Sequence, residues 1–530
     1  MIVMTKDQPA DIGLLLEGTF PYVSGGVSSW VNQIIRGFPD LNFALCFLGS
    51  TAADYGAMRY ELPSNVVHFE VHYLHTAHEN SKAISRVGDE QVFAEIREIH
   101  ERYRCPAQGS AGNMLRDLME FQRTGRYHEQ DFLHSYQAWQ YITEQYRANC
   151  TDPSFVDYFW TVRTMHAPLW LLMQIAENFV PVKAFHTIST GYAGFLGALL
   201  KQRTGKPLIL SEHGIYTKER KIDLFQAQWI HDNRSVLEKN SAEIAYFRHL
   251  WIRFFEAVGR ECYHNADHII ALYETNRQRQ ITDGAPAAKT LNIPNGIDLP
   301  RLQKLRARRA SVIPLVVCFI GRVVPIKDVK TFIRAMRTVV NHYPNIEAWI
   351  AGPEDEDPNY AKDCHSLALG LGLEPYVKFL GFQKIDDILP KVGLMVLSSI
   401  SEALPLVILE GFAAGVPCVA TDVGSCRQLI EGLDAQDKAL GQAGKVVSIA
   451  DPQALADAII QMFADPYYWH QAQQAGIARV ENYYTQDKMF QRYRDVYKQA
   501  INGSLTTEKA VAELPKVAVC PYPMAACASV

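Results

Sequence analysis

The sequence has few of the features that mark membrane, disulfide-bonded or nucleic-acid-binding proteins. No uninterrupted apolar stretch approaches the roughly 18 residues that cross a bilayer, and the segment before Ile12 carries charges where a signal peptide would be apolar. The ten cysteines form no CxxC pair, which favours a reducing compartment without zinc motifs or disulfides. With 52 Lys and Arg against 57 Asp and Glu, any phosphate binding must come from a local site. We therefore expect a cytoplasmic protein that binds no nucleic acid.

The length and the apolar runs indicate instead a two-domain α/β protein. The 530 residues exceed what one core of ordinary size contains. Short apolar runs, typical of strands buried on both faces, alternate with helical segments in both halves. Predicted strands lie at 12–16, 41–49, 65–74, 182–189, 207–214, 268–274, 313–321, 345–352, 376–381, 393–399, 417–422 and 445–450. This alternation predicts two doubly wound, Rossmann-like parallel sheets.

The first predicted domain, 1–305, is interrupted by a stretch of different composition. Residues from about 77 to 180 are polar, rich in His, Tyr, Arg and Glu, and mostly helical in pattern, with a break near Pro106 to Gly112. We expect them to form a helical insertion. Shaping an acceptor site and docking a partner both stay open as its role.

The second half is predicted to hold one further domain and a returning helix. The halves join near 299–312, in the basic stretch LPRLQKLRARRAS, and the second domain is expected over 306–475. The segment 476–502 should form a C-terminal helix that crosses back to the first domain. The small, polar, proline-containing composition of 503–530 predicts a poorly ordered tail.

Two cations follow the first predicted strand of the second domain. Arg322 and Lys327 lie in GRVVPIK at 321–327. Ligands of open α/β sheets bind beyond the carboxyl ends of the strands, so this loop suits a diphosphate. Each charge-assisted bond would contribute about 1.5–3 kcal/mol. Taken alone, a solvated loop with unrelated charges explains the pair equally well.

Two glutamates bracket a predicted strand-to-helix turn, SEALPLVILE. Pro405 suits a first turn, so a helix is predicted from Leu406, and its free N–H groups could hold phosphate oxygens. Glu410, about one turn inside, could accept two hydroxyl hydrogen bonds from a ribose, while Glu402 would face the sugar. Capping and surface charge explain most such pairs, but on the sheet edge that carries the two cations the pattern becomes specific.

Several further motifs occur with these. PNGID lies at 294–298, and GR-x4-K and E-x7-E stand in GRVVPIK and EALPLVILEGFAAGVPCVATDVG. Together they resemble glycosyltransferase family 4. The chain is most similar to the PelF-type transferases of Pel exopolysaccharide synthesis, through EGTFPYVSGGVSSWV (17–31), SEHGIYTKERKID (211–223), GRVVPIKDVKTFIRAM and GPEDEDPNY. The resemblance covers nearly the whole chain to about residue 500. It implies a GT-B fold, in which two Rossmann-like domains face a central cleft.

The resemblance implies roles at the matching positions. His213, Glu402, Arg322 and Lys327 would be catalytic, with the two cations stabilising the departing diphosphate and His213 contacting the sugar near the reacting carbon. Two glycines would let backbone approach the donor closely, which a Cβ would block. The residues expected to bind the donor are Gly25, Gly26, Arg322, Lys327, Glu402, Leu404, Leu406 and Glu410.

Two positions depart from the broad family. Asp328 stands where a glycine often follows the lysine, and Ala403 where a glycine often follows the first glutamate. Both departures leave the local backbone geometry open.

No metal or cofactor is expected. His68, His72, His75 and His78 look like a metal cluster, but residues four apart on a strand lie about 13 Å apart, too far to share an ion. The acidic run Glu354 to Asp357 is interpreted as a solvated loop. Fixed cations and a helix N-terminus can stabilise a leaving diphosphate without a metal.

The expected function follows from the resemblance. It implies a retaining, metal-independent hexosyltransferase that moves a hexose or N-acetylhexosamine from a UDP-sugar or related donor to a growing, Pel-like extracellular polysaccharide. Membrane subunits of a synthase or export complex are possible partners that would recruit it to the inner membrane. Two alternatives stay open: a non-catalytic GT-B scaffold subunit of such a complex, and a GT-B-fold sugar-nucleotide epimerase.

Overall fold

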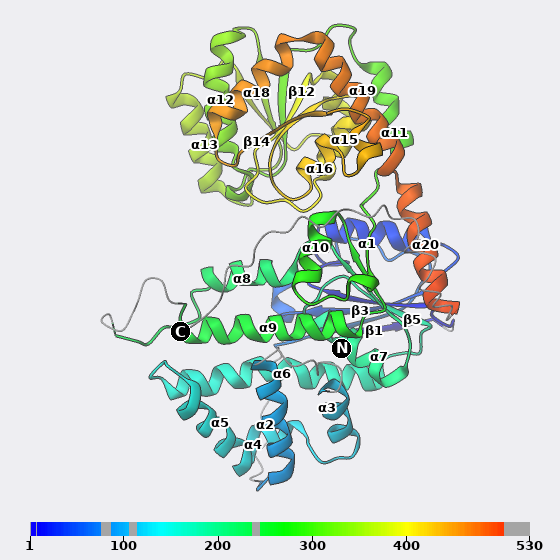
Figure 1. Ribbon diagram of the computed structural model, residues 1–530, viewed down its shortest axis with the longest axis vertical. Coiled ribbons are helices and arrows are strands. Elements are labelled where there is room, and N and C mark those ends of the chain that lie inside the picture. Colours follow the sequence, from blue (N-terminus) through cyan, green and yellow to red (C-terminus); the bar gives the residue numbers. More distant parts are fainter. Residues whose placement is uncertain (1, 7, 76–85, 105–113, 236–243, 503–530) are drawn as a thin grey trace.

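The molecule is built on two parallel sheets that stand one above the other (Figure 1). The computed structural model describes residues 2–6, 8–75, 86–104, 114–235 and 244–502, and the predicted tail and the predicted break in the insertion lie outside them. The strand order is β1-β4-β3-β2-β5-β6-β7-β8 in the first sheet and β11-β10-β9-β12-β13-β14 in the second. Among the strands of the described residues, only the edge strand β1 is antiparallel to its neighbour.

The predicted strands are all present, and two short ones were not foreseen. The first sheet contains β1 (Ile2–Thr5), β2 (Ile12–Glu17), β3 (Phe43–Gly49), β4 (Val66–Tyr73), β5 (Ala184–Thr187), β6 (Leu208–Glu212), β7 (His268–Ala271) and β8 (Thr290–Asn292). The second contains β9 (Val316–Ile320), β10 (Glu347–Ala351), β11 (Val377–Gly381), β12 (Leu394–Leu397), β13 (Cys418–Thr421) and β14 (Gly444–Val447). The two unforeseen strands, β1 and β8, lie at the edges of the first sheet.

Helices cover both faces of the first sheet. Helix α1 (Gly26–Gly37) packs on one face, with the strand side chains of Leu14, Leu45 and Phe47. The opposite face carries α7 (Tyr192–Thr204), α9 (Tyr246–Asn265) and the helical insertion. Two shorter helices, α8 (Tyr216–Gln226) and α10 (Glu274–Thr282), follow β6 and β7.

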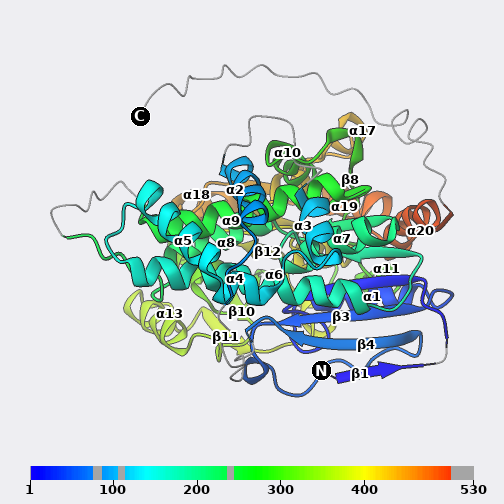
Figure 2. The same ribbon diagram turned by 90° about the horizontal axis from the view of Figure 1, so that it is seen from below.

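The described part of the insertion consists of five helices, on the side of the first domain away from the second sheet (Figures 1 and 2). They are α2 (Glu90–Arg104), α3 (Met114–Arg123), α4 (Glu129–His134), α5 (Tyr136–Asn149) and α6 (Phe155–Asn178). Helix α6 runs against α7 and α9, so the insertion shares one apolar core with the sheet. Within the described ranges, no helix combines the length and the apolar content that a bilayer span requires.

The second sheet also lies between two helical layers. The longer covering helices are α12 (Val329–His342), α13 (Pro358–Gly370), α15 (Leu406–Ala413), α18 (Pro452–Ala464) and α19 (Pro466–Tyr483). The shorter ones are α11 (Leu299–Gln303), α14 (Ile385–Ile388), α16 (Cys426–Glu431) and α17 (Ala435–Lys438). Helices α13, α18 and α19 each begin with an Asp-Pro pair, in which the Asp side chain accepts a backbone N–H and Pro occupies the first turn.

The boundary between the first and the second domain lies earlier in the chain than residue 305, where the sequence suggested it. Helix α11 packs against α15, and Leu302 and Leu305 belong to the core of the second domain. Asp298 caps α11 by accepting the N–H of Arg301 at 3.0 Å. The basic stretch 299–312 therefore belongs to the second domain, because its leucines are buried there although its composition is polar.

The chain returns to the first domain later than expected. Helix α19 stays on the second domain, and the returning helix is α20 (Gln486–Asn502), which packs on the face of α1 (Figure 1). Buried hydrogen bonds fix it: the Tyr497 hydroxyl bonds His186 Nδ1 at 2.8 Å, and Tyr493 bonds the Ser211 hydroxyl at 3.0 Å. A single bridge, Ile297 to Thr485, joins the two connections between the domains.

Candidate active site

The second-domain candidates lie at the point where the strand order reverses. Strand β9 has β10 on one side and β12 on the other. The loop after β9 carries Arg322 and Lys327, and the loop after β12 carries Glu402. In open α/β sheets, ligands bind at such a point, in the crevice beyond the carboxyl ends of the strands. The parallel register thus places the three side chains on one edge of the sheet.

Lys327 and Glu402 are in direct contact. The Lys327 ammonium donates to Glu402 Oε1 at 2.5 Å, and the Ser399 hydroxyl donates to the same oxygen at 2.6 Å. Backbone bonds hold the two loops together, since the N–H of Ile400 donates to the carbonyl of Ile326 at 2.9 Å. Both charged side chains are largely shielded, with 21% and 12% of their surface exposed. The cation is therefore preorganised at the mouth of the crevice.

Arg322 has a different partner. Its guanidinium donates to both oxygens of Glu356 at 2.5 and 2.6 Å, and the two side chains are each 51% exposed. The acidic run 354–357 is thus more than a solvated loop: Glu354 bonds His365 at 2.8 Å, and Asp357 caps α13. The composition of the run could not reveal these pairings, because they depend on how the loop after β10 folds back on the loop after β9 and on α13.

Helix α15 begins directly after the crevice. It starts at Leu406 as predicted, with Pro405 as N-cap and no side chain bonded to its first N–H groups. Leu404 is buried and Leu406 is half-buried, both in the second-domain core. An uncapped helix N-terminus favours a phosphate.

Glu410 lies one turn into α15 and is mostly buried. Burial raises the pKa of its carboxyl to about 7, with Arg301 acting to lower it and Asp386 to raise it. The Arg301 guanidinium is 3.9 Å from Glu410 Oε1 and also pairs with Asp386. Neither Arg301 nor Asp386 could be predicted from the sequence, because each joins the site only through the packing of α11 and α14.

The backbone at Asp328 explains why glycine is common there. Asp328 has φ 44° and ψ 51°, the left-handed region that favours glycine. Its side chain accepts the N–H of Thr331 at 3.2 Å and so caps α12. Asp tolerates this conformation better than most residues and supplies the cap as well. Ala403 does not have a positive φ, and its carbonyl accepts the N–H of Ser425 at 2.9 Å.

The first domain contributes a loop and a helix start. Gly26 is the first residue of α1, and Gly25 precedes it with extended backbone. A Cβ added at either glycine would meet no atom within 4 Å, so no contact within the described chain requires glycine at these positions. The α1 N-terminus has no side-chain cap and no acidic residue in its first turn, an arrangement that accepts an anion.

His213 follows β6 and is held by aromatic packing. Its ring lies 4.5 Å from that of Trp30, edge to face, and only 8% of the residue is exposed. Burial lowers its pKa to about 4, so the imidazole is neutral at pH 7. Its Nε2 has no hydrogen-bond partner among the described residues and is available to a sugar hydroxyl.

A cavity of about 610 Å³ lies beside His213 at the carboxyl edge of the first sheet. Glu17, at the end of β2, accepts the Tyr216 hydroxyl at 2.9 Å, and Arg220 donates to the same hydroxyl at 2.9 Å. Aromatic walls come from Tyr55, Tyr192, Trp229 and Trp251. Polar groups between aromatic faces suit a carbohydrate. Sequence reasoning missed Glu17, although a charged residue that ends a buried strand was a visible signal.

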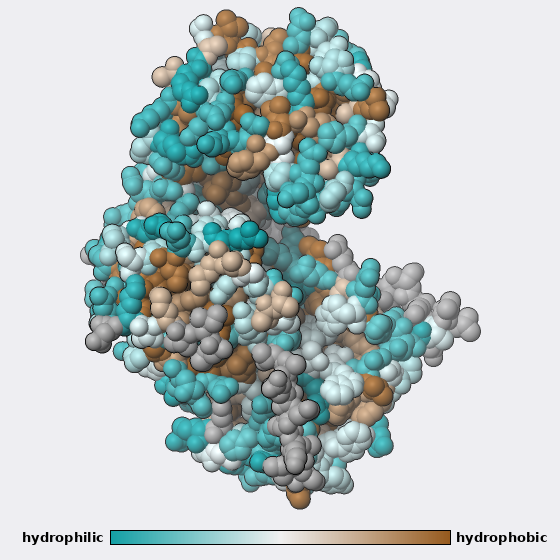
Figure 3. All heavy atoms as spheres, turned by 180° about the vertical axis from the view of Figure 1, so that it is seen from behind, coloured by the Kyte–Doolittle hydropathy of each residue, from teal (hydrophilic) through white to brown (hydrophobic). Residues whose placement is uncertain are grey.

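Figure 3 shows a groove between the upper and the lower lobe of the molecule. Within the described ranges, no hydrogen bond or ion pair joins His213, Gly25 or Gly26 to the second-domain candidates. The lobes meet instead near the connections, where Leu272 and Tyr273 pack in the second-domain core and the N–H of Glu274 donates to Gln428 at 3.3 Å.

Comparison with protein families assigns both halves. Residues 10–288 match a family described as "Domain of unknown function (DUF3492)", and residues 314–465 match "Glycosyl transferases group 1". The chain belongs to the DUF3492 family. Its second domain is similar to the group 1 glycosyl transferases.

Curated relatives match this DUF3492 protein over part of their length. The D-inositol 3-phosphate glycosyltransferase of Corynebacterium urealyticum is 32% identical over 168 residues, which are 30% of this chain and 38% of the relative. The lipopolysaccharide core biosynthesis glycosyltransferase LpsE of Rhizobium meliloti is 35% identical over 153 residues, 28% of this chain and 40% of the relative. The chain thus spans about two fifths of the length of these relatives.

Solved structures establish the fold. Anabaena HepE in complex with UDP and glucose matches with a TM-score of 0.53 and 17% identity, over 92% of this chain and 99% of that one. Sucrose-phosphate synthase from Thermosynechococcus elongatus matches with a TM-score of 0.54 and 15% identity, over 93% and 100%. The predicted GT-B fold is confirmed. At this identity the likeness concerns the fold alone.

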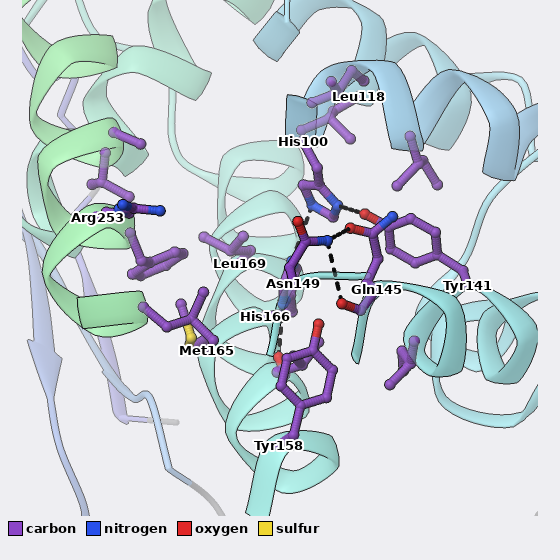
Figure 4. Close-up of a pocket in the computed structure, with 18 of the residues that line it drawn as sticks. His100, Leu118, Tyr141, Gln145, Asn149, Tyr158, Met165, His166, Leu169 and Arg253 are labelled. Carbon is purple, nitrogen blue, oxygen red and sulfur yellow. Dashed lines mark hydrogen bonds between the residues drawn. The ribbon is translucent and has the colours of Figure 1, made fainter. Parts of the chain in front are cut away.

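The DUF3492 segment also encloses a larger cavity, of about 790 Å³, between the insertion and helices α7 and α9 (Figure 4). Its walls are mostly aliphatic and aromatic. Polar groups in it bond one another: His100 Nδ1 bonds the Tyr141 hydroxyl at 2.5 Å, and the Asn149 amide donates to Gln145 at 3.1 Å. This cavity differs in chemistry from the charged crevice after β9 and β12, so the two are separate candidates.

Proposed function

We propose that this protein is a retaining glycosyltransferase. It moves a hexose or N-acetylhexosamine from a UDP-sugar to a growing extracellular polysaccharide of the Pel type. The observation that carries the proposal is the preorganised Lys327–Glu402 contact beside Arg322 and the uncapped N-terminus of α15, all on one edge of a domain similar to the group 1 glycosyl transferases. The named activities of the curated relatives point the same way.

The proposed reaction begins with donor binding in the second domain. The diphosphate takes the place of Glu356 at the Arg322 guanidinium and meets the Lys327 ammonium and the α15 N–H groups. Glu410 accepts the ribose hydroxyls. Negative charge grows on the diphosphate as the bond to the sugar breaks, so these fixed groups stabilise the transition state more than the ground state. No metal is needed for this neutralisation.

The acceptor binds in the cavity beside His213. There Glu17, Tyr216 and Arg220 offer hydrogen bonds between aromatic walls. The neutral His213 accepts or donates a hydrogen bond at the transferred sugar without adding positive charge near the developing oxocarbenium. An acceptor hydroxyl that attacks from the face the diphosphate leaves gives retention, and the departing phosphate oxygen takes its proton.

Transfer assays with point variants test the proposal. Full-length protein is first screened by calorimetry against nucleotides and UDP-sugars, and turnover is then followed by UDP release with polysaccharide acceptor. Lys327→Ala and Arg322→Ala are expected to lower kcat/KM by about 10²-fold or more while the fold survives. Lys330→Ala is the matched control, because Lys330 pairs with Asp363 on the neighbouring helix. Wild-type turnover in both test variants would reject the assignment.

The same screen separates the alternatives. A scaffold subunit binds nucleotide weakly or not at all and releases no UDP when its membrane partners are supplied. An epimerase converts the sugar nucleotide without any acceptor.

A further inference from the structure

A cluster of metal-ligating side chains lies on the first sheet, outside the cleft. His68, Glu70 and His72 alternate along β4 and therefore project from the same face, and Cys46 is the β3 residue paired with Glu70. All four are buried, between 0% and 8% exposed. Cys46 belongs to the core shared with the helical insertion, and the His68 ring packs on Phe179 after α6.

Two atoms of this cluster have only each other as partners. His72 Nε2 and Glu70 Oε1 are buried and lie 3.2 Å apart, at ion-pair distance, and neither atom has another hydrogen-bond partner in the described part of the chain. The other carboxylate oxygen bonds His68 Nε2 at 3.2 Å, and His68 Nδ1 bonds the Thr5 hydroxyl at 2.9 Å. Buried polar atoms usually have well-formed hydrogen bonds, so two atoms that share only this one contact are candidates to bind a common ligand.

We propose that Cys46, Glu70 and His72 bind one Zn²⁺ ion, with water as the fourth ligand. The three ligand atoms all lie within 4.8 Å of one another. Zinc bonds of about 2.0 Å to N or O and 2.3 Å to S place tetrahedral ligands about 3.5 Å apart, so side-chain shifts of about 1 Å complete the site. His68 orients the carboxylate through its hydrogen bond to Oε2, as outer ligand partners commonly do.

The chemistry of the three ligand atoms determines which metal ion fits. Thiolate and imidazole favour zinc over magnesium and calcium, which prefer oxygen ligands. The ion takes the place of the thiol proton, which leaves to solvent, so one proton is released for each Zn²⁺ bound. Thiolate and carboxylate together balance the charge of the ion, which suits a buried position.

This arrangement also explains why spacing along the strand was misleading. The distance between His68 and His72 excluded an ion shared by those two histidines. The third ligand comes instead from Cys46 on the neighbouring strand, directly opposite Glu70. A cross-strand partner cannot be read from a single segment. The ion joins β3 to β4 within the first domain and takes no part in donor binding.

Metal analysis and cobalt substitution of the full-length protein test the site. Protein purified without metal-affinity resin is expected to contain one zinc per chain, and Co²⁺ added to the metal-free protein to give a thiolate-to-cobalt charge-transfer band. Cys46→Ser should abolish the band. Cys262→Ser, at an equally buried cysteine of the same core, should keep it. His68→Gln should keep the band but weaken Co²⁺ binding by about 10- to 100-fold.

The wild-type titration decides the matter even if a variant fails to fold. Absence of the band in wild-type protein, together with zinc far below one per chain, overturns the proposal and leaves a hydrogen-bonded His–Glu–His cluster. A band that persists in Cys46→Ser overturns it as well, because another thiolate must then bind the ion. Zinc added to metal-free wild-type protein should also raise its Tm, and zinc added to Cys46→Ser should leave the Tm unchanged.

Discussion

The carboxyl of Glu410 makes donor binding depend on pH. Its pKa is raised to about 7 by burial, and the proposed ribose contacts require the ionised carboxylate. About nine tenths of Glu410 is then protonated at pH 6 and about one tenth at pH 8, so the Kd of a UDP-sugar should rise about tenfold from pH 8 to pH 6. A tenfold change corresponds to about 1.4 kcal/mol.

Calorimetric titration at pH 6, 7 and 8 measures this change. A UDP-sugar is the proper ligand, because free UDP has a terminal phosphate that itself titrates near pH 6. Glu410→Gln should bind more weakly and with a Kd that no longer depends on pH. Glu261→Gln is the control: burial raises the pKa of Glu261 to about 8, yet this residue lies in α9, so its removal should leave the pH dependence intact.

The ionisation of Glu410 affects stability in the opposite direction to donor binding, so the two effects can be distinguished. A carboxyl whose folded pKa lies above its ordinary value of 4.5 lowers the free energy of unfolding as pH rises from about 4.5 to about 7. Glu410 thus favours the folded state at low pH, so weaker binding there cannot come from unfolding through this group. An unchanged Kd between pH 8 and pH 6 in wild type, or a slope that survives in Glu410→Gln, would refute the assignment.

Three further outcomes are expected. Glu356→Gln should raise the affinity for the donor, by less than about fivefold, and leave kcat unchanged, because a half-exposed ion pair with Arg322 contributes at most about 1 kcal/mol. A loss of affinity in calorimetry would show instead that Glu356 contacts the donor. Asp328→Ala should lower the free energy of unfolding by about 1–2 kcal/mol, because it removes the helix cap and puts alanine in a left-handed backbone conformation. Asp328→Gly should lower it by less than about 1 kcal/mol, because glycine adopts that conformation without strain. Equal Tm values for the two variants would contradict this. Transfer in EDTA should equal transfer with added Mg²⁺, and a strict need for a divalent ion would show that Lys327 and its neighbours do not neutralise the diphosphate alone.

The features that could be predicted from the sequence are those that depend on residues close together along the chain. Buried strands show as continuous apolar runs, so both sheets could be predicted, as could the start of α15 after Pro405. The short edge strands β1 and β8 were not predicted, because a run of three or four residues shows little hydrophobic periodicity. The returning helix begins later than the sequence indicates, because α19 and α20 follow each other closely and are both rich in aromatic residues.

Partners brought from a distance could not be predicted. Glu356 pairs with Arg322 across 34 positions, and Asp386 meets Arg301 across 85. Their pairing depends on how loops from neighbouring strands converge. The sequence indicated which residues stand at the sheet edge, and the fold determined which of them touch.

The place of α20 has a consequence for the synthesis of the protein. This helix is the last described one to leave the ribosome, yet it completes the core of the domain that is made first. About 210 residues separate Asn292 from Asn502, which takes roughly 10–40 s to translate. Throughout that interval the nascent chain exposes the apolar groove that Tyr493 and Tyr497 later fill, and chaperones have a defined surface to protect.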